Sequence, residues 1–222
     1  MGKQLSCIDN FTANLDFFTC MTKSRTLVLP ASYFAPVSIY AAIVGSEKVI
    51  FDRNENFVKQ TFRSRSEIYG SNGKQMLSVP VEKRGNHMAA KDVRISYNEE
   101  WQKIHWRSIV SAYRNSPYFE FYADEFRPFF ETKNELLFEL NITLHQVVMK
   151  LLKAEIKHEF TETYISDFGS NVLDLRNEKA ILPLTSQYNQ VFEERHGFIP
   201  NLSILDLLFN AGPDSLKVLS DK

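Results

Sequence analysis

Two patterns are missing from this chain: a cysteine framework and a hydrophobic run long enough to span a bilayer. Its two cysteines, Cys7 and Cys20, form no CxxC pair and have no histidine cluster near them, so we expect free thiols and no metal site. No apolar stretch reaches the roughly 20 residues that a membrane-spanning helix needs. The first twenty residues also lack the basic start and apolar run of a signal peptide. These absences predict a cytoplasmic protein with no membrane span.

An excess of charge of one sign is missing as well. The 222 residues include 26 Lys and Arg against 27 Asp and Glu, which gives a net charge of −1. Such a chain has no global positive field to attract nucleic acid, so we do not expect nucleic acid as a partner. Apolar residues make up 44% of the chain, enough for one sizeable core. Composition therefore predicts a soluble globular protein, with its 18 phenylalanines mostly in the core.

Several catalytic and binding motifs do not occur: GxGxxG, the Walker loop, GxSxG, HExxH and CxxC. Ordinary nucleotide-binding and hydrolase folds are therefore not expected. No internal repeat or low-complexity tract is present either. The chemistry must be sought in residues outside these motifs.

The first half of the chain carries signals for strands, one helix and a hairpin. An apolar step at Leu27 to Leu29 is followed by a helix over Val37 to Val44, with Pro36 at its start and Gly45 at its end. A strand over 48–51 comes next. Asn72-Gly73 then predicts a hairpin between strands 62–69 and 75–81, and alternation predicts a further strand over 94–97.

The second half is predominantly helical. A block from Trp101 to Tyr122 reads as a helix that is N-capped by Asn98 and stopped at Pro117. A capping box over 132–135 precedes a further helical segment, a second helix covers 144–156 with His145 near its exposed start, and a last helix covers 201–210 before Gly212-Pro213. The stretch 169–183 is expected to be a long loop or a lid.

These elements predict an α/β or α+β fold, with a mixed sheet and a hairpin in the N-terminal half and helices gathered in the C-terminal half. Residues 1–25 are expected to be an N-terminal extension, and residues 26–222 a single domain.

His105 is a candidate functional residue because helical spacing turns it inward. Steps of about 100° place it on one arc with Trp101, Ile104, Ser108 and Ala112. A buried imidazole needs a hydrogen-bond partner, since leaving it unpaired costs roughly 1–3 kcal/mol. That partner is either structural, as for most inward polar residues, or part of a site.

Further polar candidates surround the first hairpin strand and the last helix. They are Lys59, Gln60, Arg63, Arg65 and Asp206. A period of two would place Arg63 and Arg65 on one strand face, where their guanidinium groups could hold a phosphate or carboxylate. The alternative is that they form a solvated charge network with Glu67, Asp52 or Glu55. Asp206 either belongs to a catalytic or ligand-binding site or, together with Ser203, caps and anchors the start of the last helix.

Several blocks resemble the WbqC-like protein family, which is associated with bacterial surface-polysaccharide gene clusters. The matching blocks are Tyr33-Phe-Ala-Pro36, the stretch 51–59, FRSR with Arg65, Leu77-Ser-Val-Pro-Val81, His105 with Tyr113 and Pro117-Tyr-Phe, and SILDLLFNAG. NENFVKQTFRSR and HWRSIVSAY are most similar to Bacteroidetes members. Two departures occur: Pro30 and Ala31 stand at the family's usual His-Gln-Pro segment, and Ser64 replaces an asparagine before the matched arginine.

The resemblance implies a transferase that modifies an activated sugar or sugar phosphate in surface-polysaccharide biosynthesis. It implies phosphate binding by Lys59 and Arg65, substrate contacts from Tyr113, a general base at His105 and an orienting or sugar-binding role for Asp206. The alternative is a non-enzymatic ligand-binding or assembly protein of the same pathway. A third hypothesis, a protein-interaction subunit, would require Phe126, Phe129 and Phe130 to be exposed, whereas we expect them in the core. The sequence identifies no donor, cofactor or oligomeric state.

Overall fold

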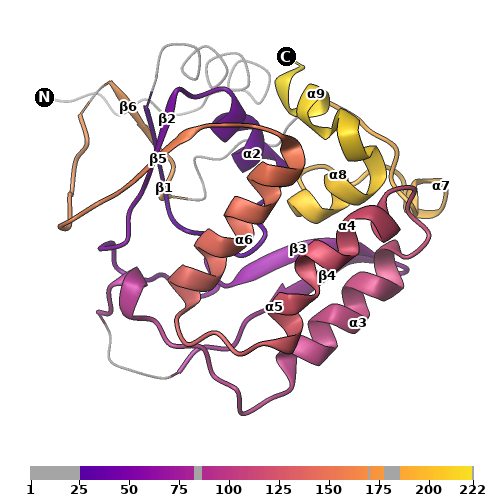
Figure 1. The fold of residues 1–222 in the computed structure, drawn as a ribbon, viewed down its shortest axis with the longest axis horizontal. Helices are drawn as coiled ribbons and strands as arrows, with labels where there is room; N and C mark the ends of the chain where they lie inside the picture. Colours follow the sequence, from indigo (N-terminus) through magenta and orange to yellow (C-terminus); the bar gives the residue numbers. More distant parts are fainter. Residues whose placement is uncertain (1–25, 83–86, 170, 178–185, 222) are drawn as a thin grey trace, which may run out of the picture.

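The computed structural model describes residues 26–82, 87–169, 171–177 and 186–221. The expected extension over 1–25 and much of the expected loop over 169–183 lie outside these residues. A four-stranded sheet occupies one side of the molecule, and a two-stranded hairpin and most helices occupy the other (Figure 1). The fold is mixed α/β, with the hairpin in the N-terminal half and helices mostly in the C-terminal half, as predicted.

The larger sheet is entirely parallel, with strand order β5-β2-β1-β6. Its strands are β1 (Thr26–Leu29), β2 (Lys48–Phe51), β5 (Lys157–Phe160) and β6 (Val172–Asp174). Helix α2 (Val37–Val44) connects β1 to β2, which confirms the predicted strand, helix and strand. Strand β6 lies within the stretch expected to be a loop. Its three residues are too few to show a pattern, and its pairing with β1 defines it.

The hairpin consists of β3 (Arg65–Gly70) and β4 (Gly73–Ser78), and Gly73 takes a φ of +100° in the turn. Strand β3 begins later than predicted because the amides of Ser64 and Arg65 donate to the Thr61 carbonyl in a turn. The strand expected over 94–97 is reduced to two isolated bridges, and Ala90–Asp92 forms a short 3-10 helix, η1.

The predicted Trp101 helix is divided at Pro117 into α3 (Trp101–Tyr113) and α4 (Phe119–Phe126), followed by α5 (Pro128–Glu131). Helix α3 starts after Glu100, and no side chain caps it, so the cap expected from Asn98 is wrong. Ile104 was also placed wrongly, because it is 56% exposed. The buried stripe follows spacings of four, four and three residues through Trp101, His105, Ile109 and Ala112.

One continuous helix, α6 (Leu137–Leu152), replaces the two helices expected after residue 132. It begins beyond the expected capping box, with no side-chain cap, and ends at Lys153 in a left-handed conformation. Asn141 lies buried within it and donates to the carbonyls of Ala31 and Arg63. His145 is buried as well, which contradicts its expected place at the surface.

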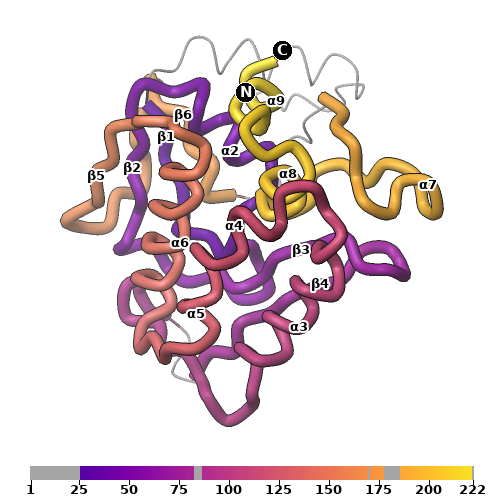
Figure 2. The backbone as a smooth tube through the Cα atoms, turned by 45° about the vertical axis from the view of Figure 1, so that its right-hand side comes forward, coloured from indigo at the N-terminus to yellow at the C-terminus, as the bar shows by residue number. Residues whose placement is uncertain are grey.

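Helix α8 (Ile204–Ala211) lies at the centre of the helical part, in contact with α2, α4, α6, α9 and β3 (Figure 2). Ser203 caps it by accepting from the Leu205 amide, as expected for the helix start. The remaining elements are α7 (Glu193–His196), the 3-10 helix η3 (Gly212–Asp214) and α9 (Ser215–Ser220). Phe126 and Phe130 are buried and Phe129 is partly buried, which confirms that they belong to the core.

Candidate functional site

Polar residues follow the parallel strands at the point where each strand ends. Asp52 comes directly after β2 and Thr161 directly after β5, while Asp174 ends β6 and Arg176 follows two residues later. Because the strands are parallel, these side chains gather at one edge of the sheet, where ligands bind in many open α/β folds.

Arg176 connects the ends of two strands. Its guanidinium lies 2.7 Å from Asp52 and 2.5 Å from Asp174, measured between nitrogen and carboxylate oxygen. Hydrogen bonding to Asp174 and Asp52 raises the pKa of Arg176 above its usual range. Thr161 donates its hydroxyl to the second Asp52 oxygen at 2.7 Å. Asp52 is thus fully buried and held from both sides.

A second ion pair lies beside the first, between Arg63 and Glu55. Arg63 Nε donates to Glu55 Oε1 at 2.7 Å and Nη2 to Oε2 at 2.6 Å, so the pair is bidentate. Both side chains are about 95% buried, with exposed fractions of 4% and 6%. Arg63 Nη2 also donates to the Arg176 carbonyl at 3.0 Å, which joins the two ion pairs. Burial raises the pKa of Glu55, against the opposing effect of Arg63.

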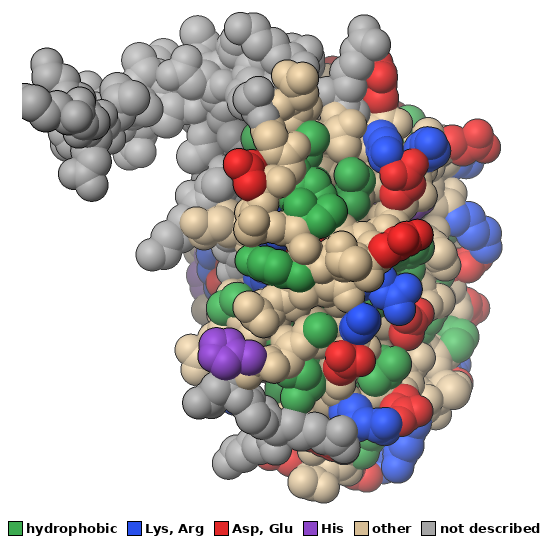
Figure 3. Space-filling view, turned by 90° about the vertical axis from the view of Figure 1, so that its left-hand side faces the viewer, with side chains coloured by type: hydrophobic (Ala, Val, Ile, Leu, Met, Phe, Trp, Pro, Cys, Tyr) green, Lys and Arg blue, Asp and Glu red, His purple; other side chains and the backbone are tan. Residues whose placement is uncertain are grey.

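These ion pairs form the wall of a pocket of about 630 Å³, which we call the Arg63 pocket. Its lining residues are Glu55, Asn56, Val58, Thr61, Arg63, Tyr164, Asp174, Arg176 and Asn177. Tyr164 and Val58 are 58% and 50% exposed and give it an apolar rim. The side of the molecule that carries β5 and β6 shows acidic and basic side chains interspersed, with hydrophobic ones between them (Figure 3). The pocket therefore combines paired charges of both signs with an exposed aromatic ring.

Comparison with known proteins identifies the family. The model of the WbqC-like protein family matches residues 31–178 and 166–218. The chain belongs to the WbqC-like protein family. The Arg63 pocket falls inside the matched range of this WbqC-like chain, from Glu55 to Asn177.

A relative of the WbqC-like chain is the "Uncharacterized protein Rv1507c" of Mycobacterium tuberculosis (strain ATCC 25618 / H37Rv). The two are 28% identical over 204 residues, which cover 77% of this chain and 87% of the relative. No solved structure matches the chain. In the part that the structure describes, none of the helices has the length and apolar character needed to cross a membrane.

Four of the predicted site residues lie on or near the segment between β2 and β3. Arg63 lines the pocket and binds Glu55, one of the partners expected in the alternative of a charge network, but the pair is buried and not solvated. Lys59 and Gln60 are exposed, between the pocket residues Val58 and Thr61. Arg65 begins β3, whereas Arg63 precedes that strand, so the expected strand face shared by these two arginines is not formed.

His105 faces inward from α3, as predicted, and is 4% exposed. Its Nδ1 lies 3.0 Å from the Tyr33 hydroxyl, and its ring also donates to the Ser78 carbonyl. Burial lowers the pKa of His105 to about 4, so the ring is neutral at pH 7. The residues that line the Arg63 pocket do not include it.

Asp206 and Tyr113 belong to another interior cluster, on α8 and α3. Asp206 Oδ2 accepts from the Tyr188 hydroxyl at 2.8 Å and from Gln190 Nε2 at 2.9 Å. Burial raises the pKa of Asp206 to about 6, although Tyr188, Tyr113 and Gln190 favour its ionised form. Tyr113 accepts from the Tyr69 amide at 3.0 Å. This cluster connects the segment before α7 to the core.

Sequence reasoning did not identify most of the pocket. The sequence suggests Asp52 and Glu55 only as ion-pair partners for an arginine, and no local motif marks Tyr164, Asp174 or Arg176. One signal was available: Asp52 stands directly after an apolar strand, the position where parallel sheets place functional polar residues. Strand β5, with the sequence KHEF, is mostly polar, and β6 has only three residues, so neither strand gives such an indication in the sequence.

Proposed function

We propose that this WbqC-like protein binds an activated sugar in the Arg63 pocket and modifies it as a transferase of bacterial surface-polysaccharide biosynthesis. The observation that carries the proposal is the joined pair of ion pairs at the carboxyl edge of the sheet. Carboxylates, guanidinium groups and the amides of Asn56 and Asn177 offer acceptors and donors for sugar hydroxyls. Tyr164 offers a flat apolar surface beside them.

Glu55 is the first candidate for acid–base chemistry in this proposal. It lines the pocket, and burial raises the pKa of its carboxyl group, as is common for catalytic carboxyl groups. His105 remains the second candidate, expected from the family resemblance. Its ring is already hydrogen-bonded to the Tyr33 hydroxyl and to the Ser78 backbone. These contacts favour a role in holding the hairpin against α3 over a role in proton transfer.

Binding can be tested by thermal unfolding of the full chain with a panel of free sugars, sugar phosphates and nucleotide sugars. A ligand at 100-fold above its Kd adds about 2.7 kcal/mol to the free energy of unfolding. Tyr164→Ala should weaken the binding of a sugar, whereas Phe121→Ala should not. Phe121 is the matched control because it is 74% exposed on α4 and does not line the pocket. Stabilisation by no sugar of any class would refute the proposal.

Turnover is tested by incubating the protein with a bound sugar and acyl-coenzyme A donors, with mass spectrometry of the sugar. A gain in the mass of the sugar that is lost in Glu55→Gln would support the transferase and its base. Loss of the same activity in His105→Ala, with Glu55→Gln still active, would transfer the role of base to His105.

A second candidate is a non-enzymatic binding or assembly protein of the same pathway. It is favoured by the pairing of the charges: Glu55 with Arg63, and Asp174 with Arg176. A carboxylate and a guanidinium group that bind each other can still form hydrogen bonds to a ligand. Such a carboxylate is less available to accept or donate a proton in a reaction. Sugar binding that Tyr164→Ala weakens, without any chemical change of the sugar, would establish this function.

A further inference from the structure

A second pocket lies at the same edge of the sheet. It has a volume of about 470 Å³ and is lined by Arg53, Lys91, Phe160, Thr161 and Glu162. Thr161 belongs to this pocket and donates to Asp52, which in turn binds Arg176 of the Arg63 pocket. The two pockets are therefore neighbours, separated by a chain of hydrogen-bonded side chains.

The backbone brings the two cations of this pocket together. Arg53 follows Asp52 and is exposed, whereas Lys91 lies in η1, 38 positions further along the sequence. The Lys91 amide donates to the Arg53 carbonyl at 3.0 Å, so the two residues are direct neighbours. Lys91 Nζ also donates to Asn54 Oδ1 at 2.7 Å, while Asn54 Nδ2 donates to the Thr161 carbonyl at 2.8 Å. Asn54 thus fixes the Lys91 ammonium beside Thr161.

The charge of this second pocket differs from that of the first. In the Arg63 pocket both arginines are held by carboxylates. Among the described residues, by contrast, neither Arg53 nor Lys91 forms an ion pair. Two cations against the single carboxylate of Glu162 leave the lining with a net positive charge. Phe160, 44% exposed, adds an apolar wall.

From this arrangement we infer that the Arg53 and Lys91 pocket is a phosphate subsite, which holds the phosphate or diphosphate of the sugar bound in the Arg63 pocket. A guanidinium group binds phosphate oxygens bidentately, and an ammonium group adds a point charge. The inference rests on the proposed function for the sugar half of the ligand. It assigns the phosphate to residues other than Lys59 and Arg65, which were expected to bind it.

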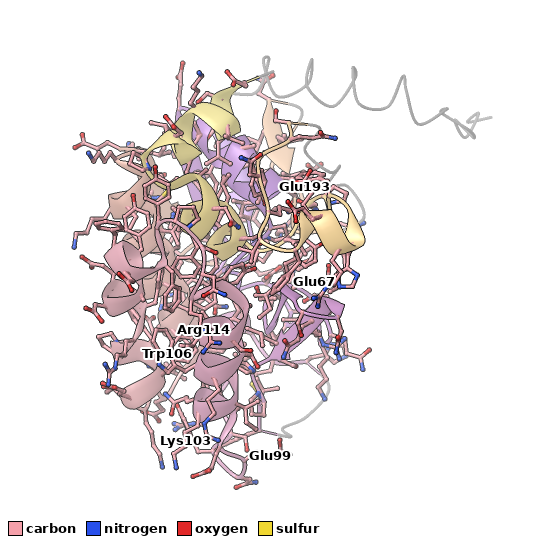
Figure 4. The ribbon with its side chains drawn as sticks, turned by 90° about the vertical axis from the view of Figure 1, so that its right-hand side faces the viewer. Glu67, Glu99, Lys103, Trp106, Arg114 and Glu193 are labelled. Carbon is pink, nitrogen blue, oxygen red and sulfur yellow. The ribbon has the colours of Figure 1, made fainter. Side chains whose placement is uncertain are left out.

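The inference is tested by isothermal titration of the full chain with inorganic pyrophosphate, a free sugar and the matching sugar phosphate. The test variant is the double substitution Arg53→Gln and Lys91→Gln. The control is Arg114→Gln and Lys217→Gln, which removes the same charge from two exposed positions, one directly after α3 and one on α9. Arg114 lies on the side of the molecule that Figure 4 shows, opposite the side in Figure 3. Thermal unfolding verifies that both variants remain folded.

We expect the sugar phosphate and pyrophosphate to bind roughly 10- to 100-fold more weakly to the test variant, with the control unchanged and the free sugar unaffected. Equal binding to the test variant and the wild type would overturn the inference. The inference would also be overturned if the wild type bound the sugar phosphate and pyrophosphate with no higher affinity than the free sugar. If pyrophosphate binds through Arg53 and Lys91 but neither the free sugar nor the sugar part of the sugar phosphate adds to binding, the phosphate subsite is supported and the proposed sugar site is refuted.

Discussion

The buried ion pair of Arg63 and Glu55 allows a quantitative prediction for Glu55→Gln. Removing one partner of a buried pair costs about 3–5 kcal/mol, because the other charge is left in a poorly solvated place. Arg63 would keep the Arg176 carbonyl as an acceptor, and the glutamine oxygen would replace one carboxylate oxygen. The glutamine NH2 group would face an Arg63 donor, because both carboxylate oxygens of Glu55 accept from Arg63. Burial already raises the pKa of Glu55, so desolvation offsets part of the contribution of the pair. We therefore expect the lower end of the range, about 3 kcal/mol. For a chain of this length the melting temperature should fall by about 6–12 °C.

The measurement is equilibrium unfolding in urea, followed by circular dichroism, with calorimetry for the melting temperature. The matched control is Glu131→Gln, the same chemical change in an exposed pair with Arg127, where both side chains are nearly 60% exposed. Such a helical surface pair contributes only about 0.3–0.5 kcal/mol. Equal losses in the two variants would refute the reasoning, since burial is the difference between the pairs.

Three further variants test the interior. Asp206→Asn should gain stability relative to the wild type as the pH rises from 4 to 7, by up to about 3 kcal/mol. The folded-state pKa of Asp206, near 6, lies above its unfolded value, so ionisation of this carboxyl group destabilises the folded wild type. Urea unfolding at the two pH values measures this, and a stability difference that does not change with pH would contradict it. Replacing His145 and His158 together by Phe should raise the stability of the variant relative to the wild type by at least about 2 kcal/mol more at pH 5 than at pH 7. The reason is that burial lowers the pKa of His145 to about 3, so at pH 5 the unfolded wild type binds a proton that the folded wild type does not. The same difference between variant and wild type at both pH values would rule this out. Gly212→Ala should destabilise the protein strongly, because Gly212 has a φ of +53° and an added Cβ would lie 2.4 Å from the Tyr118 ring; a melting temperature within 1 °C of the wild type would refute it.

The parts of the fold that could be predicted from sequence are those with local causes. Helix α2 has Pro36 before it and Gly45 after it, so both ends are marked within the segment itself. The hairpin has Asn72-Gly73 in its turn, and the inward face of His105 follows from helical spacing alone. Each of these features depends on residues close together in the sequence, and each was predicted correctly in kind.

The errors arose where a distant partner decides the outcome. His145 was expected at the surface, yet its Nε2 lies 2.9 Å from His158 Nε2 and its ring packs on Tyr40 and Phe51. Nothing near residue 145 in the sequence contains that information. The ion pair of Asp52 with Arg176 spans 124 positions and forms only when β6 aligns with β1. Pairing of strands therefore determines this part of the site, and a periodic pattern cannot indicate which strands will pair.

The departure from the family's His-Gln-Pro segment has a structural meaning. Pro30 and Ala31 follow β1 directly, so they lie at the same carboxyl edge as Asp52 and Arg176. Ala31 is also linked to the pocket, since Asn141 donates both to its carbonyl and to that of Arg63. The position at which the resemblance implies a histidine is therefore apolar and buried here, next to the proposed sugar site. For acid–base chemistry at this edge we therefore propose a carboxylate, and Glu55 is the pocket-lining carboxyl group whose pKa burial raises. Glu55 is thus the residue on which the acid–base step of the transferase proposal depends.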